Sequence, residues 1–268
     1  MNLKGKVMSI TERYHEGAMS DTGYTAINRI SVESAYIPAK VSEIVSDGFY
    51  AYESEINFND KGFINEISIM NSDVPLNIFR NIFRYDEKNR LSEIIGIYAE
   101  DIFFNEKFEY EGNKKVLRKL MSHRNIIEEQ TYEYSGKTTK STLNLIYDDS
   151  DYTVITSRDE KNRPTEEIIY FEGDVVKTTY KYNSKGLLIE SCSYDSSDEP
   201  FQKETFLYDD KNNEINHTAY DIALNEISAK WDYIYKYDKY GNWIEQIQII
   251  NDNLYAIVKR DIVYYRKP

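Results

Sequence analysis

Aromatic residues alternate with other residues along several stretches of this sequence. In the clearest stretch, from Trp231 to Tyr237, every second residue is a tryptophan or a tyrosine. A period of two places alternate side chains on opposite faces of a β-strand, so the pattern predicts strands with an aromatic face and an aromatic ladder across them. Shorter alternations of the same kind are Phe83 with Tyr85, Phe108 with Tyr110, Tyr132 with Tyr134, Tyr180 with Tyr182, and Phe206 with Tyr208.

A turn motif follows many of these aromatic residues. An aromatic residue is followed four positions later by Gly or Asn, the two residues that adopt a positive φ most readily. A type I turn that ends in a left-handed residue is a common connection between antiparallel strands. The motif therefore predicts hairpin tips at Phe58–Gly62, Tyr85–Asn89, Tyr182–Gly186, Tyr208–Asn212 and Tyr237–Gly241.

The motif recurs at a regular interval. Arg158–Arg163 repeats the sequence of Tyr85–Arg90 except at its first residue, and Tyr110–Asn113 and Tyr134–Lys137 are shortened versions. The first residues of the eight motifs stand at positions 58, 85, 110, 134, 158, 182, 208 and 237, which are 24 to 29 residues apart. Two strands, a tip and a return connection add up to about 25 residues at ordinary strand and loop lengths.

The repeat predicts the fold. We expect an all-β fold of about eight antiparallel β-hairpins, each of about 25 residues, that form an extended, twisted or spiral meander sheet. The repeats cover residues 51–268, and residues 1–50 are expected to form an N-terminal cap, because they contain no clear tip and are interrupted at 35–39 and 46–48. No linker rich in Pro, Gly or Ser divides the chain, so residues 1–268 are expected to form one elongated domain.

One segment also fits a helix. Between residues 115 and 130 the apolar positions Val116, Leu117, Leu120, Met121, Ile126 and Ile127 have spacings that suit an amphipathic helix. The phase of the repeat instead places here the strand that returns from the tip at Tyr110. We favour the strand.

Charge and composition restrict the partners. The chain has 33 Lys and Arg against 46 Asp and Glu, a net charge of −13, so a nucleic-acid partner is not expected. No apolar run approaches the roughly 18 residues of a membrane span, so no membrane insertion is expected either. The soluble chain is then either cytoplasmic or an exported protein whose signal was removed. Cys192 is the single cysteine and is expected to be a small core residue.

The tip sequences resemble a known repeat. Tyr85-Asp86-Glu87-Lys88-Asn89-Arg90-Leu91 and Tyr237-Asp238-Lys239-Tyr240-Gly241-Asn242-Trp243 are similar to the Tyr-Asp (YD) or RHS repeats of bacterial proteins, over about residues 56–250. The resemblance implies hairpins that curl into a spiral sheet. In long members it implies a shell around a toxic domain, surface or secretion-system association, and carbohydrate binding. Because Pro268 follows shortly after the last tip, we expect no appended effector domain. Eight repeats are also expected to be too few to enclose a protein, and the repeat itself offers no catalytic residue.

The sequence lacks signatures of catalysis. His15, His123 and His217 have no metal-ligand spacing, and Asp148–Asp151 and Asp195–Glu199 lack the glycine and terminal glutamate of a calcium loop, so solvated loops are expected there. Serine-hydrolase, nucleotide and dinucleotide motifs are also missing. We therefore expect no catalytic, cofactor-binding or metal-binding residues, and a protein that is not an enzyme. Paired carboxylates such as Glu128-Glu129 and Glu166-Glu167 are expected on solvent faces in a chain with 46 acidic residues. An unrecognised carboxylate pair of a hydrolase stays an alternative.

Binding is the function that the sequence favours. Trp231, Tyr240 and Trp243 surround the last tip and are the candidate ligand-binding residues, because exposed aromatic rings stack on sugars or anchor protein partners. A structural role competes with this, above all for Trp231, which continues the tyrosine ladder. The leading hypothesis is a non-enzymatic repeat protein that binds a glycan or a protein partner, glycan first. The alternative is an acidic inhibitor or immunity-type protein that binds a basic effector through a contiguous carboxylate face.

Overall fold

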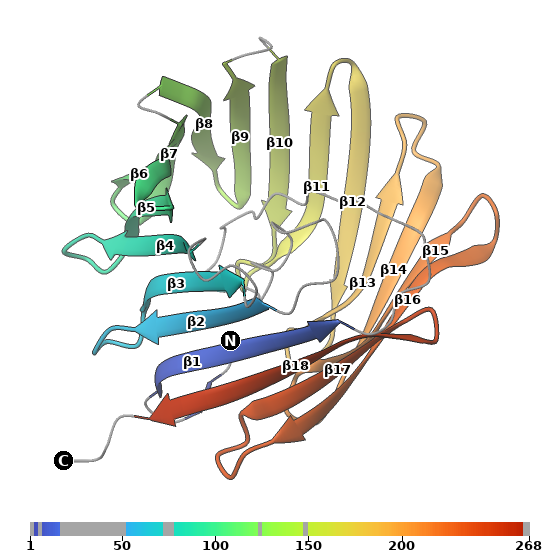
Figure 1. Ribbon diagram of the computed structural model, residues 1–268. Helices are drawn as coiled ribbons and strands as arrows, with labels where there is room; N and C mark the ends of the chain where they lie inside the picture. Colours follow the sequence, from blue (N-terminus) through green and yellow to red (C-terminus); the bar gives the residue numbers. More distant parts are fainter. Residues whose placement is uncertain are drawn as a thin grey trace. The chain divides into compact units, whose positions relative to one another are not determined.

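The computed structural model describes residues 3–4, 7–16, 52–71, 78–122, 125–146 and 150–264, and the regular structure in these ranges is β-strand throughout (Figure 1). The chain divides into two compact units. Unit 1 comprises Met1–Ile78, Ile234–Ile249 and Asn253–Pro268, and unit 2 comprises Phe79–Tyr233 and Ile250–Asp252.

Unit 1 contains the first and last strands of the chain. Strand β1 (Val7–Glu16) pairs antiparallel with β2 (Tyr52–Phe58) on one side and with β18 (Asn253–Tyr264) on the other, and Figure 1 shows it between them. Strand β2 also pairs antiparallel with β3 (Ile64–Asn71). The unit is completed by the end of β16 (Glu226–Tyr237) and most of β17 (Trp243–Ile250).

Unit 2 is a continuous meander, in which each strand pairs antiparallel with the next one in the sequence from β4 to the start of β16. Neighbouring strands are therefore joined by hairpins alternately at the two ends of the sheet. The strands are β4 (Ile78–Tyr85), β5 (Leu91–Tyr98), β6 (Asp101–Glu111), β7 (Lys114–Ser122), β8 (Asn125–Ser135), β9 (Thr138–Leu145), β10 (Ser150–Arg158), β11 (Pro164–Phe171), β12 (Asp174–Tyr182), β13 (Leu188–Tyr194), β14 (Pro200–Tyr208) and β15 (Glu214–Asp221).

The expected all-β, antiparallel fold is confirmed. Residues 115–130 lie in β7 and β8, so the strand interpretation of this segment is confirmed and the helix alternative is wrong. The apolar positions that suit a helix are distributed over two paired strands.

The expected extended or spiral meander sheet is wrong for the described residues of unit 1, whereas the N-terminal cap over residues 1–50 stays a prediction. Residues 7–16 form a strand that pairs on both sides, so β18 does not end the array as an exposed outer strand. The physical reason is that an unpaired strand edge presents free N–H and C=O groups, which β1 satisfies on β2 and β18 together. The interruptions expected at 35–39 and 46–48 lie outside the described residues, and the single elongated domain over 1–268 stays a prediction.

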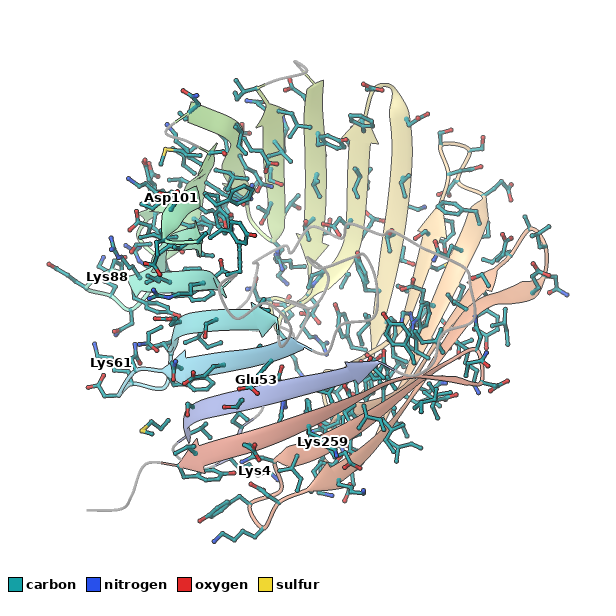
Figure 2. The ribbon with its side chains drawn as sticks, in the orientation of Figure 1. Lys4, Glu53, Lys61, Lys88, Asp101 and Lys259 are labelled. Atoms are coloured by element: carbon teal, nitrogen blue, oxygen red, sulfur yellow. The ribbon has the colours of Figure 1, made fainter. Side chains whose placement is uncertain are left out.

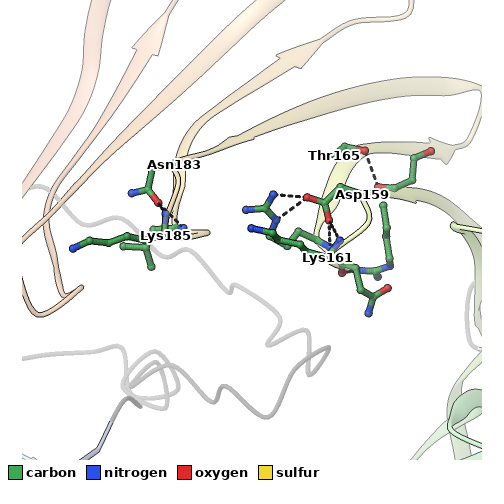
Figure 3. A network of polar contacts seen from close by, with 10 residues as sticks. Asp159, Lys161, Thr165, Asn183 and Lys185 are labelled. Carbon is green, nitrogen blue, oxygen red and sulfur yellow. Dashed lines mark hydrogen bonds and ion pairs between the residues drawn. The ribbon is translucent and has the colours of Figure 1, made fainter.

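The tip between β4 and β5 shows how the turn motif closes a hairpin. The side-chain Oδ1 of Asp86 accepts hydrogen bonds from the backbone N–H groups of Lys88 and Arg90, both at 2.9 Å. The backbone N–H of Asn89 donates to the carbonyl of Asp86 at 2.9 Å, and Asn89 has a φ of 59°. Lys88, at the outer end of this tip, is labelled in Figure 2. The same bonds recur at the tips that begin at Asn59, Asp159, Asn183, Asp195, Asp209 and Asp238, and Figure 3 shows those at Asp159 and Asn183.

One of these tips escaped the sequence pattern. Asp195–Glu199, expected to be a solvated loop, closes a tip of the same kind between β13 and β14. The position with positive φ is occupied by Asp198 (63°), where the motif requires Gly or Asn. Of the other expected loop, Asp148–Asp151, only the last two residues are described, and they begin β10.

The tyrosine that starts a tip also joins neighbouring hairpins. The hydroxyl of Tyr110 donates to the carbonyl of Leu91 at 2.8 Å, and the hydroxyl of Tyr208 donates to the carbonyl of Leu188 at 2.7 Å. The Arg90 guanidinium lies over the ring of Tyr110, 4.4 Å from its centroid. Each such tyrosine therefore fixes the start of the preceding return strand, which gives the repeated tyrosines a structural role.

Glycine at a tip position is required by its backbone. We predict that Gly186→Val lowers the free energy of unfolding by about 1 kcal/mol or more, because Gly186 has a φ of 87°. Gly241→Val is expected to act alike at a φ of 82°. The matched control is Lys185→Val, an exposed neighbour expected to change the stability by less than about 0.5 kcal/mol. Urea unfolding measures all three, and equal tolerance at the three positions would contradict the tip geometry.

Acid is expected to weaken the tip at Asp159. Hydrogen bonds from the Arg163 guanidinium and from the backbone N–H groups of Arg163 and Lys161 lower the pKa of Asp159 from 3.8 to about 2. Because the folded-state pKa is depressed, the stabilisation is complete above about pH 4 and is lost as the pH falls toward about 2. Asp159→Asn keeps the acceptor but does not titrate. Urea midpoints measured against pH should therefore fall more steeply for the natural chain than for Asp159→Asn, and parallel curves would contradict the prediction.

Candidate functional site

The three candidate aromatic residues lie in two different units. Trp231 lies in β16 within unit 2 and is half-buried. Tyr240 lies at the tip between β16 and β17 in unit 1 and is 45% exposed, whereas Trp243 begins β17 in unit 1 and is half-buried. The two units therefore carry two separate candidate surfaces.

In unit 1, Trp243 has packing partners. The guanidinium of the buried Arg260 lies 3.1 Å from the centroid of its ring, and the Tyr235 ring lies 5.9 Å away. The indole also packs against the core cluster of Ala256 and Val258. Much of the Trp243 ring is thereby used inside the unit.

Tyr240 is more available than Trp243. Its ring lies 4.6 Å from that of Tyr264, and the tip that carries it is held by Asn242, whose Nδ2 donates to the Tyr264 hydroxyl at 2.7 Å. Burial is the larger cause and a hydrogen bond to Asp238 the smaller cause that raise the pKa of Tyr264 to about 12. The phenol therefore stays protonated and remains a donor at neutral pH. Unit 1 thus presents one exposed ring on a fixed tip.

In unit 2, Trp231 belongs to a stack of three rings. The tip that begins at Asp209 and the return turn set the register in which Phe206 of β14 faces His217 of β15, which faces Trp231 of β16. The ring centroids are 4.5 Å apart in both pairs, and the planes are tilted by only 21° and 20°. The stack fixes the orientation of the Trp231 indole.

A carboxylate lies beside the stack on the same face. Glu204 accepts hydrogen bonds from the Ser191 hydroxyl and the Gln202 amide, both at 3.2 Å. Its Oε2 lies 3.6 Å from Nε2 of His217, and this buried nitrogen has no hydrogen-bond partner within the described part of the chain. Aromatic rings, a carboxylate, an amide and an imidazole therefore converge at one place.

The polar row continues across the neighbouring strands of unit 2. Register pairs link Glu204 to Ser191 and Ser191 to Tyr180, and the Tyr180 hydroxyl donates to Glu167 at 2.9 Å. Burial and the nearby Glu167 carboxylate raise the pKa of Tyr180, so this phenol remains a donor. We call the surface formed by Ser191, Gln202, Glu204, Phe206, His217 and Trp231, with Glu167 and Tyr180 beside it, the polar-aromatic face.

Farther along the row, Arg118 lies between two carboxylates. Its Nε donates to Glu106, and its Nη1 donates to Glu128 at 3.1 Å. The three side chains are largely buried, with exposed fractions of 19%, 10% and 12%. Glu128, one member of the acidic pair noted in the sequence, is therefore engaged by a cation.

The opposite face of unit 2 has a different character. Glu190 lies between Lys181 at 2.6 Å and Lys203 at 2.7 Å, and these two hydrogen bonds lower the pKa of Glu190. Arg84 and Glu93 form a similar ion pair at 2.8 Å. Carboxylates on this face thus alternate with cations.

Other chemistry is not apparent in the ranges that the structure covers. No group of three or more His, Cys, Asp or Glu side chains among the described residues could hold a metal ion. A search of the same residues for a helix with the length and apolar content of a membrane span found none. Cys192 is half-buried in β13.

The sequence analysis selected Trp231 as a candidate ligand-binding residue but did not place His217, Glu204 or Gln202 beside it. The usable signal is the tip itself. Between Tyr208 and Leu207 the register of β14 against β15 shifts by one residue, so that Leu207 faces Asn216 and Phe206 faces His217. A tip that shifts the register therefore predicts that Phe206 pairs with His217. The pairing of His217 with Trp231 depends on the return turn between β15 and β16 as well.

Removal of Arg118 is expected to destabilise the fold, because two largely buried carboxylates then lack its positive charge. We predict that Arg118→Met lowers the free energy of unfolding by about 3 kcal/mol at pH 7, because it removes the guanidinium from the largely buried carboxylates of Glu106 and Glu128. The triple variant Arg118→Met, Glu106→Gln, Glu128→Gln removes the charges together and should recover most of the loss. Urea unfolding measures both. A single variant as stable as the natural chain would show that water, not Arg118, stabilises these carboxylates.

Comparisons with known proteins give distant likenesses only. No protein-family model and no curated protein matches this chain. Among solved structures, a porin-like protein from Bacteroides uniformis is 8% identical over 97% of this chain and 98% of that chain, with a TM-score of 0.33. A porin-like protein from Bacteroides vulgatus is 10% identical over 97% and 99%, with a TM-score of 0.32. A chain of the TcdB2-TccC3-Cdc42 structure is 11% identical over 74% of this chain and 14% of that chain, with a TM-score of 0.24. Because these TM-scores lie well below 0.5, none of the likenesses assigns a family or a function, and the resemblance to YD or RHS repeats stays a prediction.

Proposed function

We propose that this chain is a non-enzymatic binding protein, with a glycan as its first candidate ligand, and that the polar-aromatic face of unit 2 is the binding surface. The observation that carries the proposal is the stack of Phe206, His217 and Trp231, with the partly exposed carboxylate of Glu204 beside it, 3.6 Å from Nε2 of His217. A carboxylate beside aromatic rings is well suited to a ligand that offers hydroxyl groups and apolar C–H surface.

The polar groups support a ligand rich in hydroxyls. Glu204 uses one oxygen each for Ser191 and Gln202, and a carboxylate oxygen can accept more than one hydrogen bond. The imidazole of His217 provides a further donor or acceptor. The ring stack holds these groups on paired strands, which is the rigidity that a preformed binding surface requires.

The hydrolase alternative receives less support. A glycosidase needs two carboxyl groups on either side of the scissile bond, one of them able to give up a proton. Two carboxylates of the polar row, Glu106 and Glu128, are both engaged by Arg118. Glu167 is engaged by the Tyr180 hydroxyl.

The inhibitor alternative requires a contiguous carboxylate face. On the opposite face of unit 2, acids such as Glu190 and Glu93 are paired with Lys or Arg. This alternation favours a glycan over a basic protein as the ligand. Because the net charge of the chain is −13, binding of a basic protein is the competing outcome that the experiment must test.

A glycan array followed by affinity measurement tests the proposal. Trp231→Ala should weaken capture of the bound glycan by about 10-fold or more, because aromatic anchors contribute 1 kcal/mol or more when truncated. Trp231→Phe keeps a ring in the stack and should retain most of the affinity. Tyr240→Ala tests the separate surface of unit 1 and should leave the affinity unchanged. Capture of a basic protein that about 1 M salt releases, in place of a glycan, would support the inhibitor alternative.

A second variant separates the hydrogen bond from the stack. His217→Phe keeps an aromatic ring between Phe206 and Trp231 but removes the Nε2 atom. We predict about a 10-fold loss of glycan affinity, the size expected for a lost hydrogen bond in a buried site, with little loss of stability. Glycan binding as strong as that of the natural chain would contradict the assigned role of His217.

A further inference from the structure

Strand β1 differs from the other strands in how it is connected. Strands β17 and β18 are joined by a two-residue turn, Asn251-Asp252, and β11 and β12 by the turn at 172–173. Strand β1 pairs with β2 and β18, but the 35 residues 17–51 separate it from β2 in the sequence. Its place in the sheet is therefore set by its own side chains and pairing and not by a short turn.

The pairing of β1 is extensive on both sides. Residues from Val7 to Glu16 face β18, from Tyr264 to Ala256, and residues from Ser9 to Tyr14 face β2. Ile10 is completely buried, with a relative exposure of 0%. The strand thus fills a site between β2 and β18, which we call the strand slot.

The strand slot has a specific chemical demand. The side chain of Arg260 in β18 is almost completely buried, with an exposed fraction of 3%. Its Nε donates a hydrogen bond to the Glu12 carboxylate of β1 at 2.5 Å. The guanidinium also lies over the face of Trp243. Burial lowers the pKa of Arg260, and the Glu12 carboxylate opposes this effect. A buried guanidinium without a carboxylate partner is strongly unfavourable, so the slot selects a strand with an apolar residue followed two positions later by an acid.

We propose that the strand slot also accepts β1 of a second copy of this chain, so that two copies can exchange their β1 strands. The second copy carries Ile10 and Glu12 with the required spacing, and exchange preserves every contact of the slot. A connection of 35 residues spans up to about 120 Å when extended, which is enough to reach a neighbouring copy. The inference is independent of the glycan proposal, because it concerns unit 1.

Concentration decides which β1 occupies the slot. The strand of the same chain is present at an effective concentration on the order of 1 mM, so it is favoured in dilute solution. Exchange is expected when the chains refold together near that concentration. Because the released state leaves Arg260 unpaired, exchange in the folded protein is expected to be slow.

Disulfide trapping tests strand exchange directly. In a Cys192→Ser background, one variant carries Thr11→Cys and the other Asp261→Cys, since Thr11 and Asp261 face each other across β1 and β18. The variants are unfolded in urea, refolded together at about 1 mM and oxidised with oxidised glutathione. We expect a mixed covalent dimer in about tenfold excess over the dimer that either variant forms alone.

The double variant Thr11→Cys, Asp261→Cys is the matched control. Refolded in dilute solution, it should form the disulfide within one chain, which establishes that the paired positions can be bridged. If the double variant closes its disulfide and the mixed variants give no excess dimer, strand exchange is overturned.

A further variant tests the chemical selectivity of the slot. Glu12→Gln, added to the Thr11→Cys copy, removes the carboxylate that Arg260 requires. In competition with a copy that keeps Glu12, the yield of mixed dimer should fall by about tenfold. Met8→Gln, an exposed position on the same strand, should leave the yield unchanged. Equal yields from the Glu12→Gln and Met8→Gln copies would show that the slot does not select the carboxylate.

Discussion

The hairpin tip is the constraint on which the rest of the structure depends. An aspartate or asparagine side chain accepts two backbone N–H bonds, and the residue three positions later adopts a positive φ, as at Asp86 and Asn89. Together these features turn the chain and shift the strand register by one residue at the same place, as at Tyr85 and Leu91. Because side chains alternate between faces, that shift determines which residues share a face of the next strand.

The polar-aromatic face of unit 2 is a consequence of this register. Phe206, His217 and Trp231 come from three strands, and they stack because two successive hairpins place them opposite one another. Glu204 lies two residues before Phe206 and therefore on the same face. Aromatic residues that hold the sheet together thus also flank the polar atoms proposed to bind a ligand, and a substitution such as Trp231→Phe is needed to separate the two roles.

Unit 1 depends on a different interaction. The buried pair of Glu12 and Arg260 joins the beginning of the chain to its end, and Trp243 covers the guanidinium. A buried ion pair contributes little to net stability, but it strongly penalises the wrong partner. The pair therefore serves to specify which strand enters the slot between β2 and β18. Trp243, selected from the sequence as a ligand-binding residue, is at least partly committed to this packing.

The strands, the period of the repeat and most of the tips could be predicted from the sequence, because they follow from local rules: side-chain alternation, a tip acceptor, and Gly or Asn at positive φ. These rules failed at Asp198, where a less usual residue adopts that conformation. Only the tertiary structure decided that β1 lies between β2 and β18 and that Glu12 meets Arg260. These residues are far apart in the chain, and which strands pair at such a separation depends on burial and charge compensation, which leave no local pattern in the sequence.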